Sequence, residues 1–216
     1  MNLKHFFTFA VCCAALLATA AERQIIRTKI QPGKKYSFLR IAKLPDDFNA
    51  LPSEGAKASF KRDAQNLYIS VNMVDADPVS ESTADQTILQ KTGDALQIFI
   101  KPAHDSRLWE VLADYNGKKS CFFHWGAGRM FYPGADAAPP VKIAAKSTKT
   151  ATGWQCDITF PIAEVAKAQK FPADTVWTIM IVRFNYGKNL PTREISCFPQ
   201  VVRNESDPVR FGVIMD

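Results

Sequence analysis

Apolar and polar residues alternate along two segments of the chain, Asn66 to Met73 and Asp94 to Lys101. The apolar positions are Leu67, Ile69, Val71 and Met73 in the first segment, and Leu96, Ile98 and Ile100 in the second. A period of two is typical of β-strands that bury one face. The opposite faces carry side chains that hydrogen-bond and stack, so the two segments predict a sheet with a usable outer surface. An acidic, turn-rich loop from Val74 to Gly93 joins them.

The same rhythm continues along the chain, where apolar stretches of strand length are separated by Pro, Gly, Asp and Asn. The predicted strands are Gln24 to Ile30, Tyr36 to Ile41, Ala56 to Arg62, Asn66 to Asp75, Asp94 to Pro102, Arg107 to Tyr115, Lys119 to Trp125, Val141 to Ser147, Gly153 to Phe160, Thr175 to Tyr186, Arg193 to Phe198 and Val209 to Ile214. A short helix is predicted over Pro161 to Gln169, because proline suits a first helical position and Glu164 suits the first turn. Ala127 to Pro140 is predicted to be a long loop. The pattern therefore predicts an all-β fold, a two-sheet antiparallel β-sandwich of jelly-roll-like form with one short helix.

The first twenty residues predict a secretory signal peptide. Lys4 precedes an apolar run from Phe6 to Leu17, and small residues ending at Ala20 make a cleavage site. No later stretch has the roughly 20 apolar residues that a membrane span needs. We expect cleavage near Ala20, a secreted or periplasmic protein, and a single domain over residues 21–216.

Cysteine content and charge narrow the set of partners. A lipid-modified Cys12 or Cys13 is the alternative to ordinary cleavage, but the residues before them lack the usual leucine and small-residue pattern. The mature chain keeps Cys121, Cys156 and Cys197, an odd number that permits at most one internal disulfide.

The formal charge of +6 comes from scattered basic residues, which indicate a solvated surface and not a nucleic-acid patch.

Several sequence phrases stand in a characteristic order. They are RDAQNLYISVNMVDADP at Arg62 to Pro78, TGDALQIFIKP at Thr92 to Pro102, ATGWQCDITFPIAEV at Ala151 to Val165, VWTIMIVRFNYG at Val176 to Gly187, REISCFPQ at Arg193 to Gln200 and PVRFGVI at Pro208 to Ile214. This order resembles family 9 carbohydrate-binding modules and DOMON-related domains, secreted β-sandwiches often attached to xylan-degrading enzymes. The resemblance covers roughly Ala56 to Ile214. It implies a non-catalytic protein that binds a glycan or sugar end in support of polysaccharide breakdown, with a glycoside hydrolase or a cell-surface component as partner.

The resemblance also implies where a sugar would bind. Sugar-binding members clamp a terminal sugar between two tryptophans, one in the loop that here runs from Val74 to Gly93 and one near the phrase SCFP. The loop has no aromatic residue here, and Cys197 and Phe198 stand at the second place. Phe198 is the one ring left there, and Gln97 matches a position where the family often has a polar residue facing the ligand. The sandwich is thus expected to be kept and the clamp to be altered or absent.

Sugar recognition needs a flat aromatic ring and planar polar groups. Trp125 lies beside His124 and ahead of a glycine-containing loop, and is the candidate ring. The other tryptophans alternate with apolar residues and are predicted in the core: Trp109, Trp154 and Trp177. Planar hydrogen-bonding candidates are Glu110, Arg183 and Asn185, although an ordinary sheet-surface ion pair explains them equally well. The predicted sugar site is therefore Gln97, Glu110, Trp125, Arg183, Asn185 and Phe198.

The acidic loop is a candidate calcium site. Calcium prefers carboxylate and carbonyl oxygens, and the candidate ligands are Asp75, Asp77 and Asp85, with Glu81 nearby. Metal sites are also a feature of the resembled family. The loop lacks dense D-x-D-x-D spacing, so a solvated acidic loop is the alternative.

An enzyme, a haem protein and an interaction module are the alternative functions. The sequence has no GxSxG, HExxH or glycine-rich phosphate loop, so we do not expect an enzyme. Related cytochrome-type sandwiches hold haem through a Met and a His, and Met73 with His104 or His124 is the candidate pair. A third hypothesis is a secreted interaction module that kept the sandwich and lost sugar binding.

Overall fold

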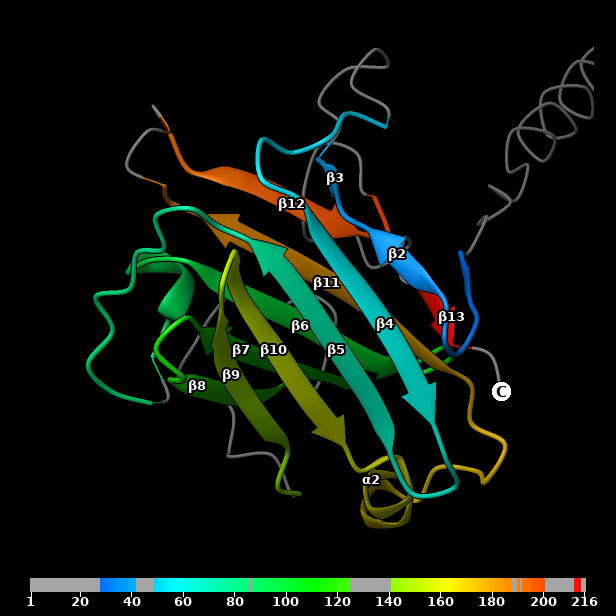
Figure 1. The fold of residues 1–216 in the computed structure, drawn as a ribbon. Helices are drawn as coiled ribbons and strands as arrows, with labels where there is room; N and C mark the ends of the chain where they lie inside the picture. The colour runs from blue at the N-terminus through cyan, green and yellow to red at the C-terminus, as the bar shows by residue number, and fades with distance from the viewer. Residues whose placement is uncertain are drawn as a thin grey trace, which may run out of the picture.

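The structure is a computed structural model that describes residues 28–41, 49–85, 87–124, 141–187, 190, 192–200 and 212–214. Figure 1 shows two β-sheets that face each other, with helix α2 at one end of the sandwich. Neighbouring strands are antiparallel except for β1 and β13, which pair in parallel. Among the described residues, no helix is long and apolar enough to cross a membrane.

The smaller sheet has five strands in the order β2-β4-β5-β10-β9. Their bounds are β2 Lys35–Ser37, β4 Ala56–Arg62, β5 Leu67–Val74, β10 Gly153–Phe160 and β9 Ala144–Thr150. The central strand β5 keeps the predicted alternation, since Leu67, Ile69, Val71 and Met73 are buried and Tyr68 and Asn72 between them are exposed. One face of this sheet is therefore core, and the other faces outward.

The larger sheet has eight strands. Its main path is β1-β13-β11-β6-β7-β8, and β12 pairs with both β11 and β3. The bounds are β1 Lys29–Ile30, β13 Gly212–Ile214, β11 Trp177–Asn185, β6 Ala95–Pro102, β7 Leu108–Asp114, β8 Lys119–His124, β12 Glu194–Phe198 and β3 Leu39–Arg40. Every residue of β7 and β11 is buried, and only Lys101 of β6 is partly exposed. The middle of this sheet is therefore covered on both faces.

The predicted sandwich is confirmed, and each predicted strand range overlaps a strand, although β9 runs to Thr150, beyond the predicted end at Ser147. One expectation was wrong. The segments Asn66 to Met73 and Asp94 to Lys101 do not form one sheet, because β5 lies in the smaller sheet and β6 in the larger one. The physical reason is that each strand has an apolar inner face, and packing the two faces against each other buries both.

The loop between β5 and β6 is fastened to the larger sheet by Asp94. The Asp94 carboxylate accepts the backbone N–H groups of Val79 and Tyr186, the latter at 2.6 Å. Gly93 has a positive φ of 153°, and a Cβ there would collide with the carbonyl of Val79. Leu89, in a short 3-10 helix (Leu89–Lys91), is fully buried. Asp94 therefore joins the acidic loop, through Val79, to the end of β11, through Tyr186.

Aromatic rings fill the core near α2. The ring centroid of Trp109 lies 4.9 Å from Phe123, 5.8 Å from Phe160 and 6.1 Å from Trp177. Edge-to-face and tilted pairs at these distances add stability beyond area burial. The predicted core positions of Trp109, Trp154 and Trp177 are confirmed, since none is more than 3 % exposed.

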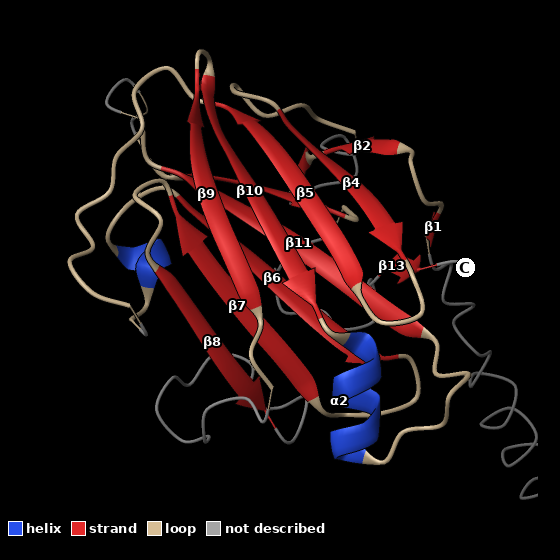
Figure 2. Ribbon diagram, turned by 60° about the horizontal axis from the view of Figure 1, so that its bottom comes forward, coloured by secondary structure: helices blue, strands red, loops and turns tan. Residues whose placement is uncertain are grey.

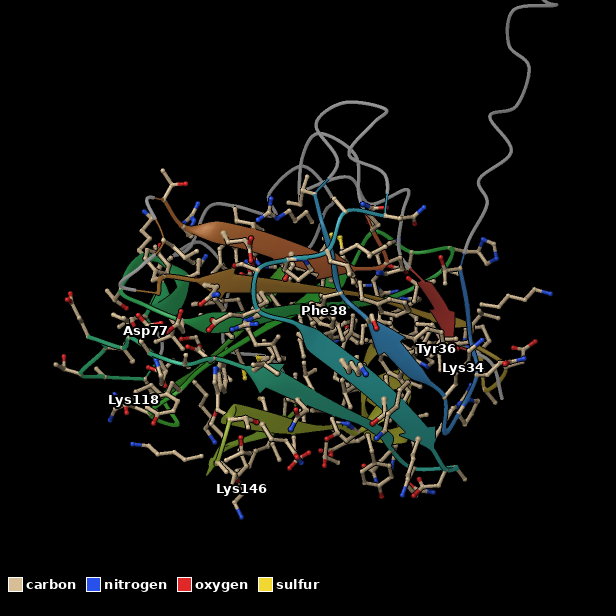
Figure 3. All side chains as sticks on the ribbon, turned by 45° about the horizontal axis from the view of Figure 1, so that its top comes forward. Lys34, Tyr36, Phe38, Asp77, Lys118 and Lys146 are labelled. Atoms are coloured by element: carbon tan, nitrogen blue, oxygen red, sulfur yellow. The ribbon has the colours of Figure 1, made fainter. Side chains whose placement is uncertain are left out.

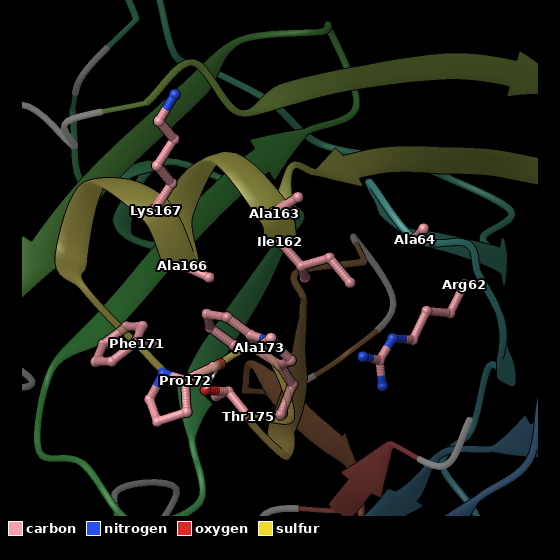
Figure 4. A pocket seen from close by; sticks show the side chains of 11 residues that line it. Arg62, Ala64, Ile162, Ala163, Ala166, Lys167, Phe171, Pro172, Ala173 and Thr175 are labelled. Atoms are coloured by element: carbon pink, nitrogen blue, oxygen red, sulfur yellow. Dashed lines mark hydrogen bonds between the residues drawn. The ribbon is translucent and has the colours of Figure 1, made fainter.

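Helix α2 (Ile162–Gln169) covers the end of the sandwich, as Figure 2 shows. It buries Ile162 and Val165, and Pro161 stands just before the helix instead of inside it. A hollow of about 300 Å³ lies between α2, the end of β4 and the segment from Phe171 to Thr175 (Figure 4). Four alanines line the hollow together with larger side chains, among them Phe171, Trp177, Arg62 and Lys167.

Candidate functional site

The predicted sugar-site residues do not gather at one exposed place. The five that are described are each at most 6 % exposed: Gln97, Glu110, Arg183, Asn185 and Phe198. Trp125 lies outside the described residues. The five fall into three groups, on the outer face of the larger sheet, between the two sheets, and in the apolar core.

The first group is a hydrogen-bonded diagonal across β6, β7 and β8, made by Gln97, Glu110 and His124. Gln97 Nε2 lies 2.6 Å from Glu110 Oε1, and His124 Nε2 lies 2.8 Å from Glu110 Oε2. Because a carboxylate only accepts hydrogen bonds, both nitrogens donate. The sequence indicates His124 only as a candidate haem ligand. Phe123 and Cys121 on the same strand face the core, so the next residue, His124, points to the opposite face. The β7–β8 register places it there beside Glu110.

This diagonal is a buried link between strands. Apolar side chains lie on the same face, among them Phe99, Leu108, Met180 and Val182. Gln97 is only 1 % exposed, and its Oε1 has no hydrogen-bond partner among the described residues. Breaking such a buried hydrogen bond costs about 1–3 kcal/mol, so the diagonal holds three strands in register. Contact of Gln97 with a sugar stays a prediction.

The second group is built around Arg183, which reaches from β11 in the larger sheet to the smaller sheet. Its Nη1 donates to the Glu54 carbonyl at 2.8 Å, and its Nη2 donates to the Val74 carbonyl at 2.7 Å. The carboxylate oxygens of Asp75 and Glu54 lie 3.3 Å and 3.7 Å from Nη2. The side chain of Arg183 is 1 % exposed. Arg183 is therefore a buried link between the sheets, not the sheet-surface ion pair that the sequence allowed.

Three carboxylates gather beside this arginine. Glu54, Asp75 and Asp77 each place one carboxylate oxygen within 4.8 Å of the others. Asn185 joins them, because its Nδ2 donates to Glu54 Oε2 at 2.9 Å. Asp75 Oδ1 and Asn185 Oδ1 are buried and lack a hydrogen-bond partner among the described residues. Such a set of oxygen donors, two of them unsatisfied, fits the ligand preference of calcium.

The membership of this acidic group differs from the prediction. Asp85 is not part of it, because its carboxylate lies elsewhere and accepts the backbone N–H of Lys119 at 3.0 Å. Glu54 was missed, since it is distant from Asp75 in the sequence and no motif connects them. Figure 3 labels Asp77 at the end of the sandwich opposite Tyr36.

Burial and, to a smaller extent, the neighbouring charge of Asp94 raise the pKa of Asp75 to about 6, against the opposing effect of Arg183. Between about pH 4 and pH 6 the folded protein therefore binds more protons than the unfolded chain. Protonated Asp75 therefore contributes to the free energy of unfolding. This contribution is fully present below about pH 4 and is lost as the pH rises through about 6.

Replacing Asp75 by Asn removes this titration while keeping the side-chain shape. In a chelating buffer, the melting temperature of Asp75→Asn relative to the wild type should become more positive by about 5 °C between pH 4.5 and pH 8. The rise from 3.8 to about 6 sets an upper limit of about 3 kcal/mol on the effect. Differential scanning fluorimetry measures it, with the exposed Asp174→Asn as control. An equal difference at both pH values would contradict the assignment.

Phe198 is a core residue. Its ring centroid lies 4.7 Å from that of Tyr36 and 5.9 Å from that of Phe60. The alternation of β12 turns Phe198 inward and Cys197 outward. The expectation that Phe198 supplies a surface ring is corrected accordingly.

The haem hypothesis required Met73 to share a site with a histidine. Met73 is fully buried on the inner face of the smaller sheet. His124 lies on the outer face of the larger sheet beside Glu110, and His104 is exposed in the turn after β6. Met73 therefore shares a site with neither His104 nor His124, and neither predicted pair is placed to hold a haem.

None of the three described cysteines, Cys121, Cys156 and Cys197, forms a disulfide. Burial raises the pKa of Cys121 to about 11 and that of Cys156 to about 12. Because the thiolate is the reactive form, these cysteines are packing residues.

The most exposed aromatic ring of the described residues is Tyr68, at 38 %. It points outward from β5, the central strand of the smaller sheet, because Leu67 and Ile69 on either side point inward. Its hydroxyl donates to Asp63 Oδ2 at 2.9 Å and accepts from Asn66 Nδ2 at 3.2 Å. These two hydrogen bonds fix the ring on an otherwise open face.

Planar and hydroxyl side chains surround Tyr68 on this face. The outward residues of the three inner strands are Lys57, Ser59 and Lys61 on β4, Tyr68, Ser70 and Asn72 on β5, and Gln155, Asp157 and Thr159 on β10. Gln155 Nε2 donates to Asp157 Oδ1 at 2.9 Å. A shallow hollow of about 450 Å³ lies beside the Tyr68 ring. We name this surface the Tyr68 face.

The fold defines a two-sheet antiparallel sandwich, and solved structures share it. The chain is similar to a family 9 carbohydrate-binding module from Caldicellulosiruptor kristjanssonii in complex with cellotriose, with a TM-score of 0.54, 16 % identity, and coverage of 87 % of this chain and 92 % of that one. The same kind of module in complex with glucose gives a TM-score of 0.55 at 16 % identity, with coverage of 87 % and 94 %. A candidate carbohydrate-binding protein from Bacteroides uniformis has a TM-score of 0.55 at 11 % identity, and the match covers 84 % of this chain and 85 % of that one.

These likenesses show that the chain has the fold of family 9 carbohydrate-binding modules. No model of a known protein family matches the sequence, and no curated protein matches it.

Proposed function

We propose that the chain is an exported, non-catalytic carbohydrate-binding protein that contacts its sugar through the Tyr68 face. The observation that carries this proposal is the exposed Tyr68 ring, fixed by Asp63 and Asn66 beside a hollow of about 450 Å³. The flat ring offers a stacking surface to the apolar side of a pyranose. The amide and carboxylate groups of Asn72 and Asp157 offer hydrogen bonds to its hydroxyls.

The fold and the N-terminal sequence support the proposal. Two similar sandwiches were solved with cellotriose and with glucose. The predicted signal peptide ending near Ala20 supports export, where polysaccharides are available as ligands. The partner that we propose is a glycoside hydrolase or a cell-surface component. Trp125 follows His124 directly in the sequence and remains a second candidate for a stacking ring.

Native affinity electrophoresis tests the function. We expect the purified full chain to be retarded in gels that contain a polysaccharide from a panel of plant and microbial glycans, and to release no reducing sugar above background. A folded protein that no polysaccharide retards would contradict sugar binding and favour the interaction-module hypothesis. Release of reducing sugar would contradict the non-catalytic assignment.

We also propose that calcium stabilises the fold at Glu54, Asp75 and Asp77, with Asn185 Oδ1 as a further ligand. The support is the convergence of three carboxylates and two unsatisfied buried oxygens. Bound calcium would supply positive charge to this group, and the protein would hold the acidic loop against β11.

Calcium should therefore raise the melting temperature. At a concentration 100 times Kd the stabilisation is about 2.7 kcal/mol, or about 5–10 °C for a chain of this size. Glu54→Gln should lose most of this shift, and Asp85→Asn should keep it. Scanning fluorimetry in calcium and in chelator gives the comparison, and an equal shift in both variants would place the ion elsewhere.

A further inference from the structure

The outer surface of the smaller sheet, which includes the Tyr68 face, carries an excess of positive charge. Four lysines point outward from this sheet and are exposed: Lys35 on β2, Lys57 and Lys61 on β4, and Lys146 on β9. Of the described residues on or beside the face, two are acidic, and both are already hydrogen-bonded. Asp157 is bonded to Gln155, and Asp63 is bonded to Tyr68.

The lysines are spread across the width of the sheet. The register places Lys35 opposite Ser59, Ser59 opposite Ser70, Ser70 opposite Asp157, and Asp157 opposite Lys146. This row crosses four spacings between strands of about 4.8 Å each, so it is about 19 Å long. Figure 3 shows Lys146 projecting away from the ribbon of the smaller sheet. Positive charge thus lies at both ends of a polar row that passes beside Tyr68.

We propose that the ligand of the Tyr68 face is an acidic polysaccharide, one that carries carboxylates on its sugar rings. This inference rests on the proposed function and names its substrate class. A chain of such sugars would cross the strands, with one ring over Tyr68 and its carboxylates beside the lysines. Charge complementarity favours this ligand over a neutral glycan. The fixed aromatic ring among amides and hydroxyls favours a sugar over a general polyanion.

The test compares polygalacturonate with its fully methyl-esterified form, which keeps the sugar chain and removes the charge. In native affinity gels, we expect the full chain to bind polygalacturonate at least tenfold more tightly than the ester, and less tightly as salt is raised. The variant Lys57→Gln/Lys61→Gln/Lys146→Gln should lose at least tenfold in affinity for polygalacturonate. The control Lys91→Gln/Lys118→Gln/Lys167→Gln removes the same charge elsewhere and should bind within about twofold of the wild type.

The outcomes separate this inference from the proposed function. Equal retardation by polygalacturonate and its ester would overturn the acidic substrate class and leave carbohydrate binding standing. Equal weakening of both triple variants would also overturn it, because the attraction would then depend on net charge alone. Retardation by double-stranded DNA as strong as that by polygalacturonate would make the surface a general polyanion site and overturn the inference. No retardation by any polysaccharide would overturn the proposed function itself.

Discussion

Replacing Arg183 by Met is expected to lower the melting temperature by about 10 °C or more. The guanidinium is 1 % exposed and donates to the carbonyls of Glu54 and Val74 across the two sheets. Met fills a similar volume but leaves both carbonyls and the Asp75 carboxylate without this partner. Removing one partner of a buried ion pair costs about 3–5 kcal/mol, and for a chain of this length each kcal/mol lowers the melting temperature by about 2–4 °C.

Thermal unfolding of Arg183→Met and Arg40→Met provides the measurement. Arg40 also pairs with a carboxylate, Glu194, but its side chain is 50 % exposed. Exposed pairs contribute about 0–1 kcal/mol, so Arg40→Met should lose a few degrees at most. Similar losses in the two variants would show that Arg183 is not the link between the sheets. Arg183→Lys keeps the positive charge but lacks the planar guanidinium with its several donors. Its melting temperature should lie between those of the wild type and Arg183→Met.

Replacing Tyr68 by Leu is expected to weaken carbohydrate binding at least tenfold while changing stability little. The ring is 38 % exposed, so its loss leaves no cavity in the core. Aromatic residues at the centre of a binding surface commonly contribute more than 1.4 kcal/mol, which is a factor of about ten in Kd. Calorimetric titration with a polysaccharide that retards the wild type measures the loss.

Two further variants make this prediction specific. Tyr68→Phe keeps the stacking ring and removes only the hydroxyl that bonds Asp63 and Asn66, so it should lose less affinity than Tyr68→Leu. Gln97→Met breaks the buried hydrogen bond to Glu110, which lies within the larger sheet and away from Tyr68. It should reduce stability by about 1–3 kcal/mol and leave binding within about twofold. Loss of binding in Gln97→Met with retention in Tyr68→Leu would move the sugar site to the larger sheet.

The alternation of apolar residues was enough to place the strands. In β5 it also identified the exposed face, because Tyr68 and Asn72 stand between buried neighbours. The pattern did not assign strands to sheets, since β5 and β6 have the same kind of apolar inner face. It also did not show that both faces of β6, β7 and β11 are covered.

The candidate site was harder to predict for the same reason. Gln97 and Glu110 were correctly placed on the face opposite the core, but that face is buried. Arg183 and Asn185 point between the sheets, where their main partner, Glu54, is far away in the sequence. Such contacts depend on how the sheets stack, which alternation along one strand does not specify. Tyr68 was visible as an outward residue, but its exposure follows only from its place on the central strand of the smaller sheet.

The most direct test of the central claim is a chemical-shift map of the isotopically labelled full chain during titration with oligogalacturonate. Our account predicts that the shifted amides cluster on the three inner strands of the smaller sheet, at Lys57 to Lys61, Tyr68 to Asn72 and Gln155 to Thr159. Shifts centred on Gln97 and Glu110 in the larger sheet, or no shifts at saturating oligosaccharide, would contradict it.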